Sequence, residues 1–311
     1  MKKTLLLTAL ASLFLFSCKK EHSGIIKNPS VKKYAVRFNV TNFTQKQGAF
    51  SIRHKNLSSD TLTNLNSYFD VLDCFIYDQP YPADPTIIKQ DSTMANMGVI
   101  TDSLAAGNYT IIIIAGKKGL SYDGLLFKPQ DAEFGYGGKW QDAFQTRVYV
   151  TVGAGNTTQN ITLKRTVGKL EVQLLDNIPA TADSLIVSVN SETLTQELDN
   201  AIVYNGTFVA NYAMQIPASA KGKPNFVMDR IIGNTDEING KTVTITCKDA
   251  SNHVIATKTV NDVYFKANTK TILSGNLFTG SGGGQSQSFT AKADTAWGST
   301  PTTVNFGLRR H

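Results

Sequence analysis

The chain contains 311 residues, of which 41% are hydrophobic and only 18% are charged, with a formal net charge of +7. This length is sufficient for two domains with substantial hydrophobic cores, and the composition is that of a globular protein. The basic residues are scattered rather than grouped with aromatic residues, which argues against nucleic-acid binding. Thr, Asn, Ser, Gly and Val are frequent, and they favour strands and turns over helices.

The first residues have the features of an export signal. A basic start, Met1–Lys3, precedes the apolar run Thr4–Phe16, which is too short to span a bilayer. The run ends in Leu15-Phe16-Ser17-Cys18, which resembles a bacterial lipobox and predicts cleavage before Cys18 and lipidation of its thiol. Acyl chains such as palmitate anchor a protein without a transmembrane helix. We therefore predict a lipoprotein signal peptide at residues 1–17 and an outer-membrane-anchored tether at residues 18–32; a plain secretory signal is the alternative.

Alternating apolar and polar residues predict strands throughout residues 33–165. Tyr34–Val40 alternates strictly, which is the pattern of a strand with one buried face. Gly107–Ala115 is almost continuously apolar, so we predict a central strand covered on both faces. Asp60–Leu72 has near-helical spacing and predicts a short helix. Thr146–Val152 and Thr157–Leu163 flank a Gly-rich turn and predict a β-hairpin.

The connection Leu120–Phe144 has no clean period and is rich in aromatic residues and glycine. Long loops of this kind often contact ligands, so Tyr136 and Trp140 are candidate contacts for a glycan or a partner. The simpler expectation is that the loop folds onto its own aromatic cluster.

The second half, residues 166–279, repeats the strand pattern. It opens in Lys164–Asp176, where Leu170, Val172 and Leu174 share one face of a predicted strand and polar residues occupy the other. About seven short strands with regular turns predict a β-sandwich. No strand precedes a long amphipathic helix, so a parallel α/β sheet is disfavoured.

The last segment, residues 280–311, begins with a Gly-rich hinge and continues with two alternating stretches. These stretches are expected either to fold back on their own domain or to add a strand to the sheet edge of another subunit.

No catalytic or metal-binding motif is apparent. The four histidines are isolated from each other and from nucleophile motifs, and no Gly-rich phosphate-binding loop follows a strand. Cys74 and Cys247 lie in different halves, each in an alternating strand and without metal-ligand spacing. We expect two buried thiols, with a disulfide as the alternative. The sequence thus predicts no enzyme, no cofactor and no metal site.

Several motifs, in this order along the chain, resemble the Bacteroidetes fimbrillin superfamily. They are the lipobox ending at Cys18, the strand Gly107–Gly116 (GNYTIIIIAG), the mid-chain stretches Arg165–Val172 (RTVGKLEV) and Ile178–Val187, and Asn268–Phe278. The resemblance covers most of the chain. It implies an all-β protein with two tandem transthyretin-like β-sandwich domains after a lipoprotein signal peptide, and a role as stalk, tip or anchor of surface fimbriae.

Stalk subunits of that family are matured by an Arg-specific protease that removes the first strand. The corresponding candidates in this chain are Arg37 and Arg53, which both lie in apparent strands rather than in an obvious loop. Their position favours an anchor-like or stand-alone surface lipoprotein over a processed stalk subunit.

The sequence therefore predicts a lipid-anchored, surface-exposed fimbrillin-like protein of the outer membrane that serves fimbria assembly or adhesion. Its expected partners are the membrane, through Cys18, and other fimbrial subunits, by donor-strand exchange. The alternative is a surface glycan-binding lipoprotein that uses the Leu120–Phe144 aromatics. A hydrolase without a recognisable motif is the third hypothesis.

Overall fold

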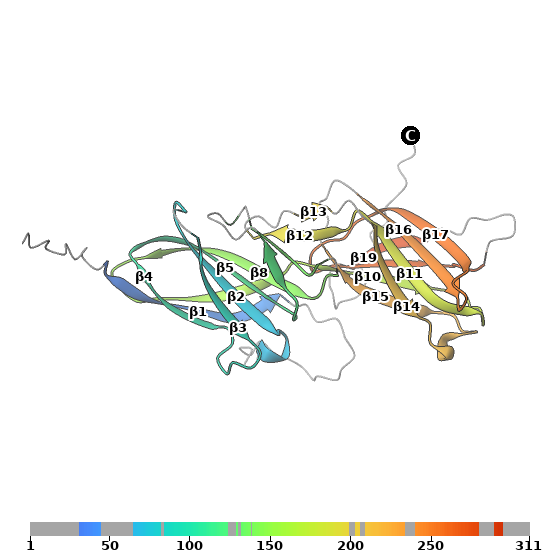
Figure 1. Ribbon diagram of the computed structural model, residues 1–311, viewed down its shortest axis with the longest axis horizontal. Coiled ribbons are helices and arrows are strands. Elements are labelled where there is room, and N and C mark those ends of the chain that lie inside the picture. Colours follow the sequence, from blue (N-terminus) through green and yellow to red (C-terminus); the bar gives the residue numbers. More distant parts are fainter. Residues whose placement is uncertain are drawn as a thin grey trace, which may run out of the picture. The chain divides into compact units, whose positions relative to one another are not determined.

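The structure is a computed structural model that describes residues 31–44, 65–81, 84–123, 129, 132–137, 139–198, 203–205, 209–233, 240–279 and 289–294. Within these residues the protein is all-β, with two short 3-10 helices, η1 (Leu65–Ser67) and η3 (Ala218–Ala220) (Figure 1). The predicted signal peptide, Cys18, Arg53 and the Gly-rich hinge lie outside the described residues.

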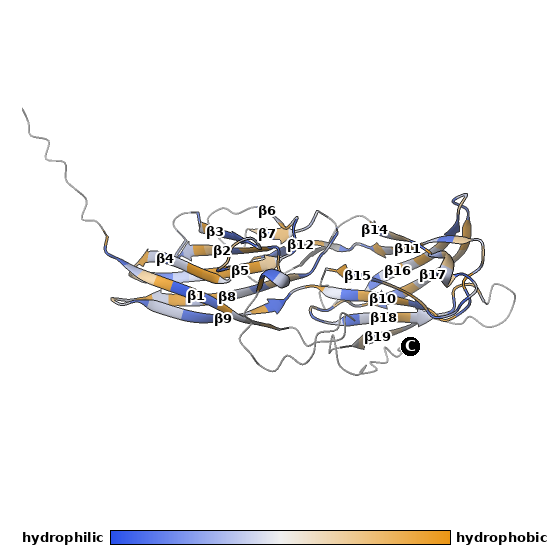
Figure 2. Ribbon diagram, turned by 90° about the horizontal axis from the view of Figure 1, so that it is seen from below, coloured by the Kyte–Doolittle hydropathy of each residue, from blue (hydrophilic) through white to orange (hydrophobic). Residues whose placement is uncertain are grey.

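The first half forms a seven-stranded sheet with the order β3-β2-β5-β8-β9-β1-β4. Figure 2 shows β2 and β3 on the opposite side of this half from β1 and β9. Both sides contribute to one hydrophobic core, which contains residues from Val36 to Leu163. The strands are β1 (Lys33–Thr44), β2 (Val71–Asp78), β3 (Thr86–Asp91), β4 (Val99–Ala105), β5 (Gly107–Gly116), β8 (Ala143–Val152) and β9 (Thr157–Arg165).

Strand β5 confirms the expectation of a central strand covered on both faces. It pairs with β2 on one side and β8 on the other, and every residue from Tyr109 to Gly116 is buried. The alternation Val36, Phe38, Val40 likewise places one face of β1 in the core. The predicted helix at Asp60–Leu72 is reduced, in its described part, to η1, because strand β2 already begins at Val71.

The predicted antiparallel pairing of β8 with β9 is present, in the register of a turn at residues 153–156, but it is short. The two strands pair only through Phe144–Arg165 and Gln145–Lys164, at the end of the pair away from residues 153–156. Strand β9 instead pairs in parallel with β1 over Val36–Thr44. A Gly-rich turn permits tight pairing but does not require it, and β9 buries Ile161 and Leu163 by joining the other side of the sheet.

The second half contains two four-stranded sheets, with the orders β15-β10-β18-β19 and β14-β11-β16-β17. Their inward residues form a second core that runs from Leu170 to Phe289. In β16, where Cys247 was predicted to lie in an alternating strand, the alternate residues Val243, Ile245 and Cys247 are fully buried. The strands are β10 (Gly168–Leu174), β11 (Ala182–Asn190), β14 (Val209–Gln215), β15 (Phe226–Ile232), β16 (Lys241–Asp249), β17 (Val254–Val263), β18 (Lys270–Gly275) and β19 (Thr290–Asp294).

The C-terminal strand β19 folds back on its own chain. It pairs antiparallel with β18, and Phe289 covers Gly275. A Cβ added to Gly275 would lie 2.8 Å from Cγ of Phe289, so only glycine permits this approach.

A small fourth sheet, β13-β12-β7-β6, combines strands from both halves. Strand β7 (Glu133–Gly135) comes from the aromatic connection and pairs with β12 (Thr193–Glu197). A Cβ on Gly135 would lie 2.6 Å from the carbonyl oxygen of Leu194, so this contact needs glycine. The other strands are β6 (Ser121–Asp123) and β13 (Val203–Asn205).

A third core lies beside this sheet and also draws residues from both halves. Phe75, Ile112 and Trp140 of the first half pack there with Val167 and Leu198. The boundaries at residues 33–165 and 166–279, and the transthyretin-like character of the two parts, stay predictions.

An ion pair between a buried arginine and a partly exposed aspartate fixes the chain at the point where the first half ends. Arg165, at the end of β9, donates from Nε and Nη2 to the two carboxylate oxygens of Asp142, each at 2.7 Å. Its guanidinium lies 4.8 Å from the ring centroid of Phe144, and Nη1 contacts the Asn268 side chain at 3.4 Å. The Arg165 side chain is 2% exposed. One cation therefore joins two segments of the first half to a loop of the second.

The two described cysteines are free and buried, as expected. Burial raises the pKa of Cys74 to about 12 and that of Cys247 to about 11, so both stay thiols at neutral pH.

Replacing Asp142 with alanine is expected to lower the free energy of unfolding by about 3 kcal/mol, because Arg165 would keep a buried charge without its partner. Urea denaturation measures this effect. The control is His253→Ala: His253 pairs with Asp249 but its side chain is 80% exposed, so the loss should stay below about 0.5 kcal/mol. Equal losses in the two variants would contradict the role of the Arg165 pair.

Candidate functional site

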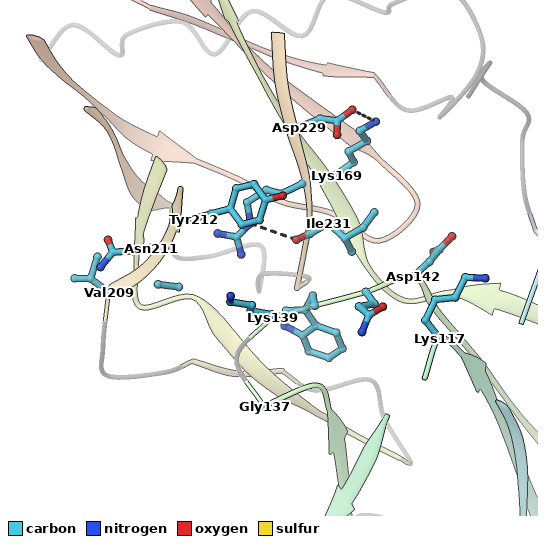
Figure 3. A pocket seen from close by; sticks show the side chains of 14 residues that line it. Lys117, Gly137, Lys139, Asp142, Lys169, Val209, Asn211, Tyr212, Asp229 and Ile231 are labelled. Carbon is cyan, nitrogen blue, oxygen red and sulfur yellow. Dashed lines mark hydrogen bonds and ion pairs between the residues drawn. The ribbon is translucent and has the colours of Figure 1, made fainter. Parts of the chain in front are cut away.

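A concave site of the described surface with both aromatic and charged walls lies where the two halves meet. This junction pocket has a volume of about 530 Å³, within the range of small-molecule sites. One wall comes from Lys117 and from the described residues between 137 and 142, and the other comes from β10, β14 and β15 (Figure 3). The third core and the β7–β12 pairing hold the two walls together.

Arg230 of β15 connects the two sheets of the second half inside this pocket. It pairs with the carboxylate of Glu192, and its Nε donates to the carbonyl oxygen of Ile231 at 3.3 Å. Its guanidinium also lies 5.5 Å from the ring centroid of Tyr212 on β14. The side chains of Arg230 and Glu192 are 7% and 1% exposed. Burial raises the pKa of Glu192, and the charge of Arg230 offsets part of that rise.

The other charges of the pocket are mostly paired. Lys169 bonds Asp229 across strands at 2.5 Å, and Lys117 lies 3.6 Å from Asp70. Lys169 points away from the core, as the alternation of its strand predicts, but is only 7% exposed because it lies in the wall of the pocket.

Lys139 is the exception among these cations. It is exposed, and no carboxylate of the described residues lies within ion-pair distance of its ammonium group. The pocket therefore carries one uncompensated positive charge.

Trp140 forms part of the pocket wall and part of the third core. Its side chain packs edge-on against Phe134 and Tyr136, with ring centroids 6.1 Å away in each case, and the residue is 6% exposed. The described aromatic residues of this connection therefore pack against each other, in line with the simpler expectation, within a core that also includes Phe75 and Leu198, and Trp140 still reaches the pocket.

Tyr136 supports the pocket wall from behind. Its hydroxyl accepts from the backbone N–H of Lys117 at 2.9 Å and donates to the carbonyl oxygen of Asp142 at 3.2 Å. Burial raises the pKa of the Tyr136 hydroxyl, so it stays protonated in the physiological range. Of the two predicted contact residues, only Trp140 lines the pocket.

Arg37, the described candidate for proteolytic processing, lies in β1. Its backbone pairs with Thr101 of β4 on one side and Thr158 of β9 on the other, so this strand is internal to the sheet. Its side chain is exposed and Nε bonds the Asn39 side chain at 2.8 Å. Processing at Arg37 stays a prediction; cleavage there would require the paired strand to open.

The sequence patterns did not identify Lys139, Tyr212 or Arg230 as pocket residues. One signal was available: Arg230 occupies an inward position in the alternation Met228, Arg230, Ile232, where an apolar residue is expected. A cation at a core-facing position implies a buried partner or a ligand. Its meeting with β14 and with residues 139–142 could not be read from spacing.

Among the described residues, no group of three or more His, Cys, Asp or Glu side chains could hold a metal ion. No helix in the described part of the chain is long and apolar enough to cross a membrane.

Comparison with known proteins gives fold-level matches only. No protein-family model matches the chain. A search of curated proteins finds no relative. Several solved structures match this chain over nearly their whole length. The three described below are at most 11% identical to it in sequence.

The fimbrial anchor protein Mfa2 from Porphyromonas gingivalis matches with a TM-score of 0.52 and 11% identity, covering 85% of this chain and 98% of Mfa2. A proposed adhesin from Bacteroides thetaiotaomicron matches with a TM-score of 0.53 and 9% identity, covering 88% and 97%. A proposed polysaccharide-binding protein from the same species matches with a TM-score of 0.52 and 11% identity, covering 88% and 99%. The chain thus has the fold of Bacteroidetes fimbrial and adhesin-type proteins, as the motif resemblance implied.

Replacing Tyr136 with phenylalanine is expected to lower the free energy of unfolding by about 1 kcal/mol, because the N–H of Lys117 loses its acceptor. Amide hydrogen exchange at Lys117 should accelerate before the global transition. The matched control is Tyr149→Phe, since Tyr149 is 62% exposed and its loss of a hydroxyl should change neither measurement. Unchanged exchange in Tyr136→Phe would show that the hydroxyl does not support the wall.

Proposed function

We propose that this chain is a lipid-anchored, surface-exposed fimbrillin-like protein of the outer membrane, acting as a structural or anchor component of fimbriae involved in adhesion. The observation that carries the proposal is the match to a fimbrial anchor protein over 98% of that protein's length. In this proposal the two halves are tandem transthyretin-like β-sandwiches, and the protein has no enzymatic activity.

The anchor role is favoured over the processed-stalk role by the position of Arg37. A stalk subunit of the resembled family loses its first strand, whereas β1 here lies between two hydrogen-bonded neighbours and contributes Val36, Phe38 and Val40 to the core. Removing such a strand would lower the free energy of unfolding by about 2 kcal/mol for each large apolar side chain taken from the core. A permanently attached lipoprotein needs no such step.

The anchor proposal predicts that protein isolated from membranes of its native host begins at an acylated Cys18. Intact mass measurement and N-terminal mapping test this directly. The control is Cys18→Ser, which should leave the protein off the membrane because the acylated thiol is absent. An unlipidated chain that begins just after Arg37 or Arg53 would identify a released, polymerising subunit instead.

Fimbrial partners are proposed to engage this protein by donor-strand exchange, in which an extended segment adds to an open sheet edge. The candidate segment includes β19, which in the isolated chain covers the edge of β18. Among residues 289–293 only Phe289 is buried, so most of the second core does not depend on this strand.

Deleting residues 285–311 is expected to leave a folded monomer that no longer assembles with other subunits, because the segment that would be donated is missing. Circular dichroism of the truncated protein reports whether it is folded, and size-exclusion chromatography of a mixture with other subunits reports whether it assembles. The full chain is the control in both measurements. Unfolding of the truncated protein would show that the tail belongs to its own domain, and unimpaired assembly would exclude donation of the tail.

The second candidate function is glycan binding at the cell surface. It is favoured by the junction pocket, where Trp140 and Tyr212 lie beside polar and charged groups. A solved structure described as a proposed polysaccharide-binding protein shares this fold.

A further inference from the structure

The hydrogen-bonding capacity of Arg230 is only partly used. A guanidinium carries five N–H donors, and those of Arg230 reach Glu192 and the carbonyl oxygen of Ile231. These bonds come from Nη2 and Nε, and Nη1 has no acceptor among the described residues. The Arg230 side chain is only 7% exposed, yet the residue lines the pocket. Its guanidinium therefore has N–H donors that remain available to a ligand.

Glu192 sets the direction of this guanidinium. The Glu192 carboxylate bonds Nη2 on one side, and the ring of Tyr212 lies 5.5 Å from the Arg230 guanidinium carbon. Held by the carboxylate and the aromatic ring, the group has little rotational freedom to lose when it binds an anion. Preorganised donors bind more tightly because less side-chain entropy is lost.

Lys139 supplies a second positive group to the same pocket from the opposite wall (Figure 3). It is exposed and has no ion-pair partner among the described residues. Two cationic groups from different elements, one rigid and one adaptable, are suited to a single anionic substituent such as a carboxylate or a sulfate.

The remaining surfaces suit the ring of a sugar rather than a bare anion. Trp140 and Tyr212 offer aromatic surface. Val209 and Asn211 lie on the opposite face of β14 from Tyr212, where Oδ1 of Asn211 accepts from the Ser188 hydroxyl at 2.5 Å, so neither side chain is assigned a ligand contact. A pocket with aromatic walls and a few convergent polar groups is the usual form of a small-molecule site.

We infer that the junction pocket binds a negatively charged sugar residue, whose carboxylate or sulfate pairs with Nη1 of Arg230 and with the Lys139 ammonium. The sugar ring packs against the aromatic wall of Trp140 and Tyr212. A neutral sugar leaves the Lys139 ammonium without an anion and Nη1 of Arg230 without a charged acceptor, so the pocket discriminates by charge. The inference rests on the second proposed function and names its ligand class and its site.

The test uses the full mature chain and three methyl galactosides that differ only at carbon 6: a carboxylate (galacturonoside), a 6-sulfate and the neutral hydroxymethyl. Isothermal titration calorimetry measures binding. The two acids are expected to bind at least about tenfold more tightly than the neutral sugar, which corresponds to one charge-assisted hydrogen bond or more. Whichever acid binds more tightly identifies the natural substituent. Equal binding of all three sugars, or no binding of either acid, would overturn the inference.

Lys139→Gln tests the site without disturbing the core, because this side chain is exposed. Its affinity for the better acid should fall roughly tenfold, with a weaker dependence on salt, since one screened charge has been removed. The matched control is Lys118→Gln, an exposed lysine near the pocket that does not line it, and its affinity should be unchanged. The same loss in both variants, or in neither, would place binding elsewhere.

Sodium acetate and sodium sulfate at the same concentrations serve as the charge-only arm. They should bind much more weakly than the acidic sugars, and equal binding would show that the aromatic wall contributes nothing and would overturn the assignment to a sugar. The N-terminal mapping of the same preparation separates two failures: an acylated Cys18 without acidic-sugar binding removes the pocket assignment and leaves the fimbrial anchor role intact.

Discussion

The bidentate contact between Arg165 and Asp142 is the constraint on which the junction depends. Arg165 ends the last strand of the first half, and Asp142 directly precedes β8, so the pair closes one end of the β8–β9 pairing. The same guanidinium reaches Asn268 in the second half. Because the Arg165 guanidinium is buried, any movement that separates Asp142 from β9 would leave its charge without compensation, at a cost of several kcal/mol. The pocket beside this pair therefore has a defined shape.

Two kinds of cation occupy this junction, and their surroundings assign them different roles. Arg165 has a complete partner set, with a carboxylate, a side-chain amide and an aromatic ring. Arg230 is similarly buried but keeps an unused edge toward the pocket, and Lys139 faces the same space from the solvent side. The first arrangement joins structure to structure. The arrangement of Arg230 and Lys139 leaves hydrogen-bond donors and charge available for a ligand, whereas Arg165 has a structural role.

The sequence predicted best where local pattern and burial coincide. Continuous apolar residues at Gly107–Ala115 gave a central strand, and alternation gave the inward faces of β1, β10 and β16. It did not predict that β9 separates from most of β8 and pairs with β1, because this parallel partner is more than 100 residues away in the chain. The aromatic connection was expected to form its own cluster, but its pairing with β12 has no local signal, since both strands are short and their partners are distant.

By itself, the sequence determined the all-β class, the strands with clear apolar patterns, the buried thiols and the likeness to fimbrillins, because each follows from composition, a short period or a contiguous motif. It did not predict β3, β4, β6, β7 or β12. Only the tertiary structure decided that Trp140 and Lys139 share a pocket with Tyr212 and Arg230, and that β19 returns to β18 of its own chain. The residues on the two walls of the pocket, such as Trp140 and Tyr212, are 70 or more positions apart in the sequence. Paired residues of β18 and β19 are 16 or more positions apart. No local period encodes such distances; they are set by how whole sheets bury their apolar faces against one another.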